Sequence, residues 1–284
     1  MGYTFKKTAL LFLILAAFSI PAFGQTSKFN VEYSTKEGSL TKKDFVKKEF
    51  GRYDGYQLPL NKGEYAYFVI FSNDFSPNLV LMDPNGEVYQ RSSSKGDQYV
   101  SVGINAPVGG EWLLYVIGDS TALGDYSLQL GFTDSASLSI NKKADFCTGL
   151  DYLTAHANAY FVFLQSLPTE EPLYQLEGSV DAIINGDDAS YTTSFYQGNN
   201  SAEAAKIYES LLAKIKACPA LTGWTFQSTD WQHTSSGKEM TAVWRGKKSG
   251  SHRLVQVSFC DLSEATDADY PEDYTIELVI KKSN

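Results

Sequence analysis

The chain has little of the two residue types that carry most nucleophilic and metal chemistry, with three cysteines and three histidines among its 284 residues. The cysteine spacings match no zinc-binding pattern. His252 and Cys260 fall on one expected strand, about 26 Å apart, and Cys147 and His156 fall on one expected helix, about 13 Å apart. Both separations exclude a cysteine–histidine nucleophile pair, which requires hydrogen-bond contact.

The short motifs of common enzyme classes are also missing. The sequence contains no Gly-x-Ser-x-Gly, no His-Glu-x-x-His and no phosphate-cradling glycine loop. His233 follows Asp230 in a polar segment, and a surface loop explains it without catalysis. We therefore predict no catalytic residue and no cofactor, while a hydrolase that uses carboxylates alone stays open.

Long hydrophobic runs are nearly absent. The run at residues 9–20 follows Lys6 and Lys7 and is too short to span a bilayer comfortably. Small residues at Ala22 and Gly24 predict cleavage before Gln25, so residues 1–24 are expected to be a signal peptide. No cysteine follows at that point, which argues against a lipid anchor, and no later segment is apolar enough to cross a membrane. The mature protein is expected to be secreted or periplasmic.

Positive charge is scarce. The chain has 24 lysines and arginines but 33 acidic residues, which gives a formal net charge of −9. An acidic surface disfavours nucleic acid as a partner and permits divalent cations. One exception is a cluster of Lys42, Lys43, Lys47 and Lys48, which is broken by Asp44. This cluster is either a solvated surface or a docking patch for an anionic cell-wall polymer.

Aromatic residues, in contrast, are abundant, and the 18 tyrosines and 17 phenylalanines favour a β-rich fold. Residues 65–71 alternate with period two and are apolar on both faces, which predicts a strand inside a sandwich. Further strands are expected at residues 78–82, 87–90 and 99–106, separated by turns rich in Asp, Asn, Pro and Gly. Together these patterns predict an all-β sandwich over residues 25–132.

Three segments around this stretch carry a family resemblance: YDGYQLPL at 53–60, GEWLLYV at 110–116 and GDYSLQL at 124–130. Over residues 47–132 the chain resembles the bacterial pre-peptidase C-terminal domain family. The resemblance implies a small jelly-roll-like β-sandwich of the kind attached to secreted enzymes, often peptidases. Some members bind calcium or a polymeric substrate. No recognisable peptidase domain accompanies the segment here.

Calcium is the best chemical candidate in the sandwich. The ion prefers several oxygen ligands on a bent loop. Asp74, Asp83 and Asn85 fall in expected turns, where some members of the family bind calcium, so we treat them as candidate calcium ligands. Turn formation alone also explains all three residues.

The remaining chain differs in pattern. Residues 133–144 are rich in Ser, Asp and Lys and predict a linker. Residues 145–284 predict an α+β domain with two helices on an antiparallel sheet, and no family is recognised for this half. The expected strands cover residues 173–184, 189–197, 224–231, 239–245, 254–260 and 274–281.

The two helices of this half are expected at residues 145–167 and 201–217, from apolar residues spaced three and four apart. Asp145 is expected to cap the first helix. Asn200 is expected to cap the second, with Glu203 reaching back to it.

An oxidising compartment allows one disulfide among the three cysteines and leaves one thiol over. Helix packing by itself does not decide the pairing. Cys260 lies on the strand face opposite Val255, Val257 and Phe259, away from the expected core. The predicted pair is therefore Cys147 with Cys218.

From these observations we predict a secreted, non-catalytic accessory or binding protein whose partner is an unknown polymer or an envelope protein. Its first expected binding loops are residues 74–77 and 264–273. One alternative is a hydrolase with its site in the C-terminal half, which a cleft gathering His233 with carboxylates would favour. Another is a periplasmic chaperone or assembly factor, which an uncovered apolar sheet face would favour.

Overall fold

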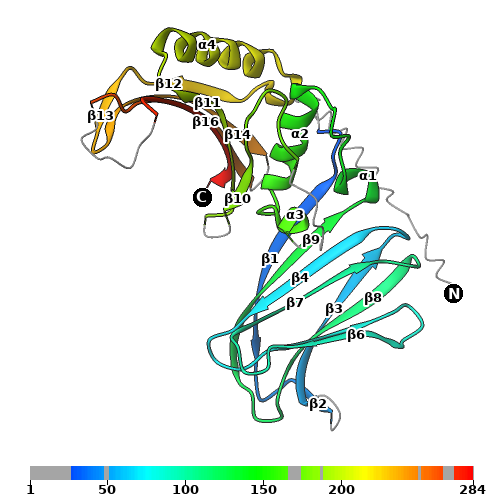
Figure 1. Ribbon diagram of the computed structural model, residues 1–284. Helices are drawn as coiled ribbons and strands as arrows, with labels where there is room; N and C mark the ends of the chain where they lie inside the picture. Colours follow the sequence, from blue (N-terminus) through cyan, green and yellow to red (C-terminus); the bar gives the residue numbers. More distant parts are fainter. Residues whose placement is uncertain are drawn as a thin grey trace, which may run out of the picture.

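The computed structural model describes residues 27–47, 51–165, 174–185, 188–248, 251–264 and 272–283. Strands predominate and form three antiparallel sheets, with few helices (Figure 1). The expected signal peptide, residues 1–24, lies outside the described residues.

Two of the sheets face each other as a sandwich, which confirms the predicted all-β sandwich. The four-stranded sheet has the order β1 (Val31–Leu40), β9 (Gly124–Thr133), β4 (Tyr65–Phe71) and β7 (Tyr99–Asn105). The five-stranded sheet has the order β2 (Phe45–Lys47), β3 (Gly51–Leu60), β8 (Gly110–Gly118), β5 (Asn78–Met82) and β6 (Val88–Ser93).

Strand β4 lies in the middle of the four-stranded sheet, as its apolar faces predict. Ala66, Phe68 and Ile70 are buried in the core between the sheets, where Trp112 of β8 is also fully buried. The turn after β5 forms as expected, since the backbone N–H of Gly86 donates to the carbonyl oxygen of Asp83 and Gly86 takes a φ of 83°. Positive φ at this position suits glycine.

The third sheet contains most of the C-terminal strands. Its order is β10 (Ile183–Asn185), β11 (Ser190–Gly198), β16 (Tyr274–Ser283), β15 (Ser251–Asp261), β14 (Gly237–Lys248) and β12 (Thr225–Ser228), and β13 (Gln232–Thr234) also pairs with β14.

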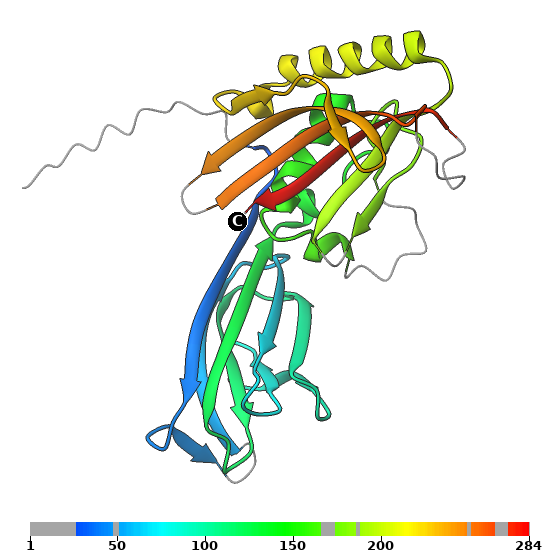
Figure 2. The same ribbon diagram turned by 90° about the vertical axis from the view of Figure 1, so that its left-hand side faces the viewer.

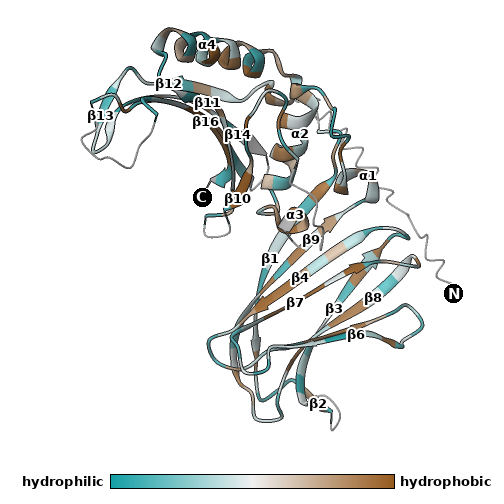
Figure 3. Cartoon of the chain, viewed as in Figure 1, coloured by the Kyte–Doolittle hydropathy of each residue, from teal (hydrophilic) through white to brown (hydrophobic). Residues whose placement is uncertain are grey.

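Helices α2 (Phe146–Ala157) and α4 (Ser201–Ala217) pack on one face of this sheet (Figure 2). One hydrophobic core lies between the helices and the sheet, and it contains Leu150 of α2, Leu211 of α4 and, on β16, Ile276, Leu278 and Ile280. Figure 3 shows how hydrophobic and hydrophilic residues alternate around α4, as an amphipathic helix requires.

Both predicted caps are present. Asp145 accepts a hydrogen bond from the backbone N–H of Thr148 at 3.0 Å, and the side chain of Asn200 accepts from those of Ala202 and Glu203. The expected reach-back by Glu203 does not occur among the described hydrogen bonds, because the backbone N–H of Asn200 donates to the Tyr196 hydroxyl instead.

Three predicted elements are shorter than expected. The helix expected over residues 145–167 stops at Ala157, because Tyr160 and Phe161 take left-handed φ values of 51° and 57°, and α3 (Val162–Gln165) follows. Phe161 is fully buried, and this burial offsets the backbone strain.

The other two shortened elements are strands. The strand expected over residues 173–184 is reduced to β10, because a turn at Leu176–Ser179, with Gly178 at a φ of 87°, precedes it. The strand expected over residues 224–231 is reduced to β12, and β13 begins only after that range.

The segment expected to be a linker is partly folded. Thr133 ends β9, and Asp134 caps the short helix α1 (Ser135–Leu138). Leu138 is buried with Val31 of β1 and Phe163 of α3 in a hydrophobic group that we call the junction cluster: Val31, Leu138, Ala155, Ala159 and Phe163. The cluster packs the sandwich against α2 and α3.

This contact predicts how the chain behaves when it is cut. Trypsin should cleave at the exposed Lys142 and Lys143, yet the two fragments should elute together in gel filtration, because the junction cluster buries apolar surface from both. Phe163→Ala should weaken this association. Fragments of the unmodified protein that separate in native buffer would contradict the prediction.

Candidate functional site

The helix-free face of the third sheet is the candidate site. The sheet bends so that this face is concave, and no described helix covers it (Figures 1 and 2). Because side chains alternate along a strand and Ile276, Leu278 and Ile280 enter the core, Thr275, Glu277 and Val279 point away from it. We call this surface the open face: Thr192, Ser194, Gln197, Glu239, Thr241, Val243, Gln256, Ser258, Cys260, Thr275, Glu277 and Val279.

Strand register arranges the open face in rows. Thr241, Ser258, Glu277 and Ser194 lie side by side across β14, β15, β16 and β11. The next row holds Glu239, Cys260, Thr275 and Gln197. Amide and hydroxyl groups hydrogen-bond within the face, since Gln256 donates to Ser258 and Gln197 donates to Ser194.

Glu277 is a half-buried carboxylate at the centre of this surface. Burial raises its pKa, and the nearby carboxylates of Asp181 and Glu239 raise it further. Asp181 sits at the sheet edge, where it accepts a hydrogen bond from the backbone N–H of Ser194 at 2.7 Å. Within the described ranges, none of the ion pairs involves Glu277, Glu239 or Asp181. The centre of the open face therefore gathers negative charge, while Lys281 and Arg245, towards the strand ends on the same side of the sheet, contact Asp188 and Gln227.

Cys260 lies in the same surface and is not disulfide-bonded. Its strand neighbours Val257 and Phe259 are in the core, so the thiol is on the opposite face, as the alternation predicts. Burial and the carboxylate of Glu239 raise the pKa of the thiol to about 11. A thiol with this pKa stays protonated near neutral pH and is a poor nucleophile.

The histidines are dispersed. His156 is fully buried in α2, where Nε2 contacts the carbonyl oxygen of Ser137. His233 is exposed on β13 opposite Lys238, and His252 is on β15. In the part of the chain that the structure describes, no hydrogen bond or ion pair joins His233 to a carboxylate. The structure therefore does not bring His233 into a cleft of acids.

The calcium candidates are divided between two places. Asp74 lies near Gly124 and accepts a hydrogen bond from the backbone N–H of Asp125 at the start of β9. Asp83 and Asn85 share the turn at the other end of β5, a strand of about 17 Å. The structure brings Asp83 and Asn85 together and leaves Asp74 apart from them.

The Asp83 carboxylate already has local partners. It accepts from the backbone N–H groups of Glu87 and Asn85, and these bonds, that of Glu87 first, lower its pKa. Among the described residues, no group of three or more His, Cys, Asp or Glu is arranged to hold a metal ion. Calcium binding stays a prediction, limited to the turn of Asp83 and Asn85.

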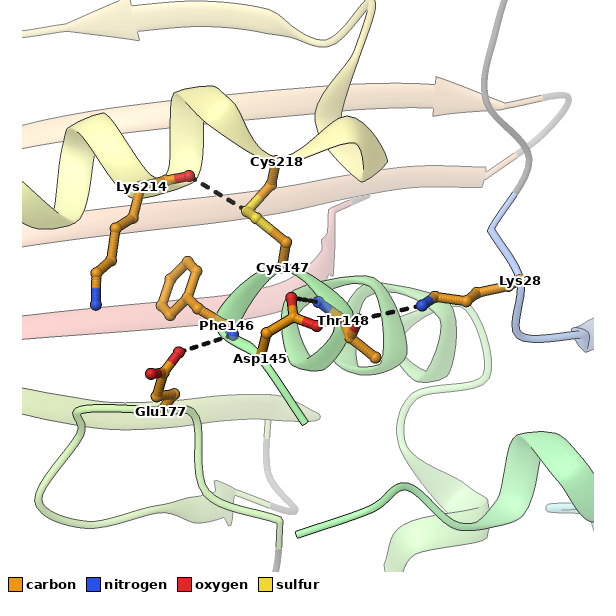
Figure 4. Close-up of a disulfide and its surroundings, with 8 residues drawn as sticks. All are labelled: Lys28, Asp145, Phe146, Cys147, Thr148, Glu177, Lys214 and Cys218. Atoms are coloured by element: carbon orange, nitrogen blue, oxygen red, sulfur yellow. Dashed lines mark hydrogen bonds between the residues drawn. A yellow bond between two sulfur atoms is a disulfide. The ribbon is translucent and has the colours of Figure 1, made fainter. Parts of the chain in front are cut away.

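Cys147 and Cys218 form a disulfide, the pairing that the sequence analysis expected (Figure 4). Cys147 is in the first turn of α2 and Cys218 is the C-cap of α4. Around the bond, the backbone N–H of Phe146 donates to Glu177, and Lys28 donates to the Thr148 hydroxyl. The bond joins the two helices that cover the sheet.

The expected binding loops contribute little that the structure can describe. In residues 74–77, Asp74 is engaged with Asp125. In residues 264–273, Glu264 pairs with Lys238 at 2.8 Å, and residues 265–271 lie outside the described ranges. The sequence patterns favour binding in loops, and they suggest an uncovered sheet face only for the chaperone alternative. The sequence feature that could have indicated the open face is the alternation of the polar residues Thr275, Glu277 and Lys281 along the last strand.

Comparison with known proteins finds no matching family model and no matching curated protein. Among solved structures, the chain is similar in part to PliG of Aeromonas hydrophila, a periplasmic inhibitor of g-type lysozyme, with 16% identity over 38% of this chain and 91% of that chain and a TM-score of 0.29. It is also similar to the pre-peptidase C-terminal domain of collagenase from Bacillus anthracis, with 18% identity over 34% and 87% and a TM-score of 0.27.

A third similar structure is a disulfide-linked pilus of Bacillus endospore appendages, with 12% identity over 40% of this chain and 95% of that chain and a TM-score of 0.27. The collagenase domain belongs to the family that residues 47–132 resemble. Likenesses at these TM-scores do not assign the chain to a family, and they carry no argument about its function.

Proposed function

We propose that this protein is a secreted, non-catalytic binding protein of the cell envelope or extracellular space, and that its open face binds a cationic group of a partner protein. The observation that carries the proposal is the half-buried Glu277 carboxylate, which lies among Asp181 and Glu239 and has a raised pKa. Carboxylates held close together repel one another and make folding of the isolated protein less favourable. Such unfavourable arrangements are typical of functional sites.

A lysine or arginine of a partner would remove this cost. An ammonium or guanidinium group beside Glu277 would stabilise the ionised carboxylate and lower its pKa. The surrounding amides and hydroxyls, such as Gln256 and Ser258, offer hydrogen bonds to the remaining polar groups of the partner. The concave shape of the face suits a convex partner surface (Figure 1).

The proposed location rests on two observations. Residues 1–24 have the pattern of a signal peptide, and the Cys147–Cys218 disulfide is typical of oxidising compartments. In the described ranges no helix is long and apolar enough to cross a membrane. We further infer two domains, a sandwich over residues 25–132 and an α+β domain over residues 145–284, which pack together through the junction cluster.

One alternative has a specific observation in its favour. A carboxyl group with a raised pKa is what a general acid needs, so Glu277 with Glu239 or Asp181 supports a hydrolase as the second candidate. The chaperone alternative has less support, because the uncovered sheet face is mainly polar and that hypothesis requires an apolar one.

The test compares matched charge changes on the two sides of the sheet. Immobilised protein should capture a partner from the native envelope fraction, and Glu277→Gln should weaken the capture at least tenfold, since the partner's buried cation loses its counter-charge. Glu209→Gln, on the exposed side of α4, should bind like the unmodified protein. Thermal unfolding should show that Glu277→Gln does not destabilise the fold, because it relieves repulsion.

Equal capture by Glu277→Gln and the unmodified protein would refute the proposed site. Hydrolysis of a peptide or glycan library that disappears in Glu277→Gln would refute the non-catalytic function and establish the second candidate.

A further inference from the structure

The outer face of the five-stranded sheet, on the other half of the molecule, carries a row of rings and polar groups. Register places Phe45, Tyr53, Ile117, Asn78 and Ser93 side by side across β2, β3, β8, β5 and β6. Tyr115, Val80 and Arg91 form the adjacent row. We call these eight residues, together with Lys47, the aromatic face. Five strands at ~4.8 Å spacing make it about 19 Å long.

The aromatic rings at the β2 end of this face pack against each other and are exposed to solvent. Phe45 is 76% exposed and stacks on Tyr53 with ring centroids 6.2 Å apart. Tyr53 in turn meets Tyr115 edge-on at 5.2 Å. Phe45 is not part of the core of the sandwich, so core packing does not explain an exposed phenylalanine at this position.

The other end of the face is hollowed. A depression of about 270 Å³ is lined by Asn78, Val80, Arg91, Ser93 and Ile117. Its lining combines the apolar residues Val80 and Ile117 with amide, hydroxyl and guanidinium groups. The exposed rings therefore lead across the sheet into a shallow polar-rimmed groove.

The charge of this face is opposite to that of the whole chain. Lys47 lies over the Tyr53 ring at 5.8 Å, and Arg91 lies on β6, at the other end of the face. Among the described residues of these five strands that point to the same side, the one carboxylate is Glu111, at the far end of β8. Lys42 and Lys43 are exposed in the turn before β2, and the one carboxylate of this turn, Asp44, accepts a hydrogen bond from the backbone N–H of Thr41. On a chain of net charge −9, this local excess of cations favours an anionic ligand.

We propose that the aromatic face is a second binding site and that its ligand is an acidic polysaccharide. Sugar rings present apolar C–H faces to Phe45 and Tyr53, and their hydroxyls match Asn78 and Ser93. The carboxylates of the polymer pair with Lys47 and Arg91. This site lies on a different sheet from the open face and does not depend on it.

The spacing of charge favours a polysaccharide over a nucleic acid. Lys47 on β2 and Arg91 on β6 are four strands, about 19 Å, apart. A nucleic acid strand carries a phosphate every ~3.4 Å along a duplex and would bring about five charges over that length. A polymer with one carboxylate every few sugars matches two separated cations.

The experiment measures binding of the full mature chain to hyaluronate, which carries a carboxylate on every second sugar, with dextran as the neutral polymer and polyuridylate as the nucleic acid. We expect binding to hyaluronate that weakens at about 0.5 M salt, as for surface charge pairs. Phe45→Ala and Arg91→Gln should each weaken it at least fivefold. Tyr99→Ala, another exposed ring on β7 of the other sheet, and Lys62→Gln, an exposed lysine in a turn, should bind within twofold of the unmodified chain.

Several results would overturn the proposal. Equal binding by Phe45→Ala and Arg91→Gln would remove the aromatic face from the interaction. Equal binding to dextran would refute the role of charge, and tighter binding to polyuridylate would assign the face to nucleic acid. No binding to hyaluronate, with self-association that Phe45→Ala abolishes, would make the face a contact between copies of the chain.

Discussion

Replacing both Cys147 and Cys218 by serine is expected to lower the free energy of unfolding by about 4–5 kcal/mol. The disulfide closes a loop with a sequence separation of 71 residues, so in the chain-entropy model its loss greatly enlarges the unfolded ensemble. The change is a large part of the roughly 5–15 kcal/mol that typically stabilises a folded protein. Urea unfolding followed by circular dichroism measures it.

The third cysteine provides the control. Cys260→Ser changes a half-buried thiol on the open face and removes no cross-link, so it should cost less than about 1 kcal/mol. Because α2 and α4 lose their covalent connection, the double serine variant should also open first around these helices in hydrogen exchange. A double variant as stable as Cys260→Ser would contradict the prediction.

Acid should destabilise the protein through His156. The ring is fully buried between Tyr152 and Phe163, and burial lowers the pKa of the imidazole from 6.5 to about 4. Since Nε2 faces the carbonyl oxygen of Ser137, the neutral ring carries its proton there. Protonation would add a second N–H at Nδ1, which is buried and has no hydrogen-bond partner among the described residues. The folded state therefore disfavours the charged ring.

The direction of the pH effect on stability follows from the lowered pKa of His156. The folded protein prefers neutral His156, so its contribution to stability is complete above about pH 6.5 and is lost as the pH falls through about 4. The loss amounts to about 3 kcal/mol at roughly 1.36 kcal/mol per pKa unit. Unfolding free energies measured from pH 7 to pH 4 should show this loss.

Other groups titrate in the same pH range, so a variant is needed to isolate the contribution of His156 to the loss of stability. His156→Gln keeps an amide donor for the Ser137 carbonyl and cannot become charged, and it should lose about 3 kcal/mol less than the unmodified protein between pH 7 and pH 4. His233→Gln, at an exposed position, should behave like the unmodified protein. Parallel pH profiles for His156→Gln and the unmodified protein would refute the assignment.

Local pattern was enough to predict much of the fold. The strand predicted from the alternation at residues 65–71 is β4. The helix expected at residues 201–217 is α4, with Asn200 as its cap. These features depend on neighbours within a few residues, where side-chain periodicity and capping act directly. The side of the sheet on which Cys260 lies was also predictable, because its orientation follows from alternation along a single strand.

Local pattern failed where distant contacts override it. The periodic spacing at residues 145–167 continues through Tyr160 and Phe161, yet the helix breaks there and Phe161 is buried in the core with Tyr191 nearby. Leu138, in the segment of linker composition at residues 133–144, is likewise buried against Val31 and Phe163, while the role of this segment as a linker stays a prediction. Burial of apolar side chains against remote segments decided both cases.

The candidate sites show most clearly which features follow from local sequence pattern and which follow from tertiary structure. The sequence by itself determined which residues of an expected strand share a face, such as Thr275 with Glu277, whereas β2, which holds Phe45 and Lys47, was not among the expected strands. Only the tertiary structure decided that Glu277 lies near Asp181 and Glu239, and that Phe45, Tyr53 and Tyr115 pack ring against ring. Strand order and register join residues far apart in the chain, and a pattern confined to one strand carries no information about either.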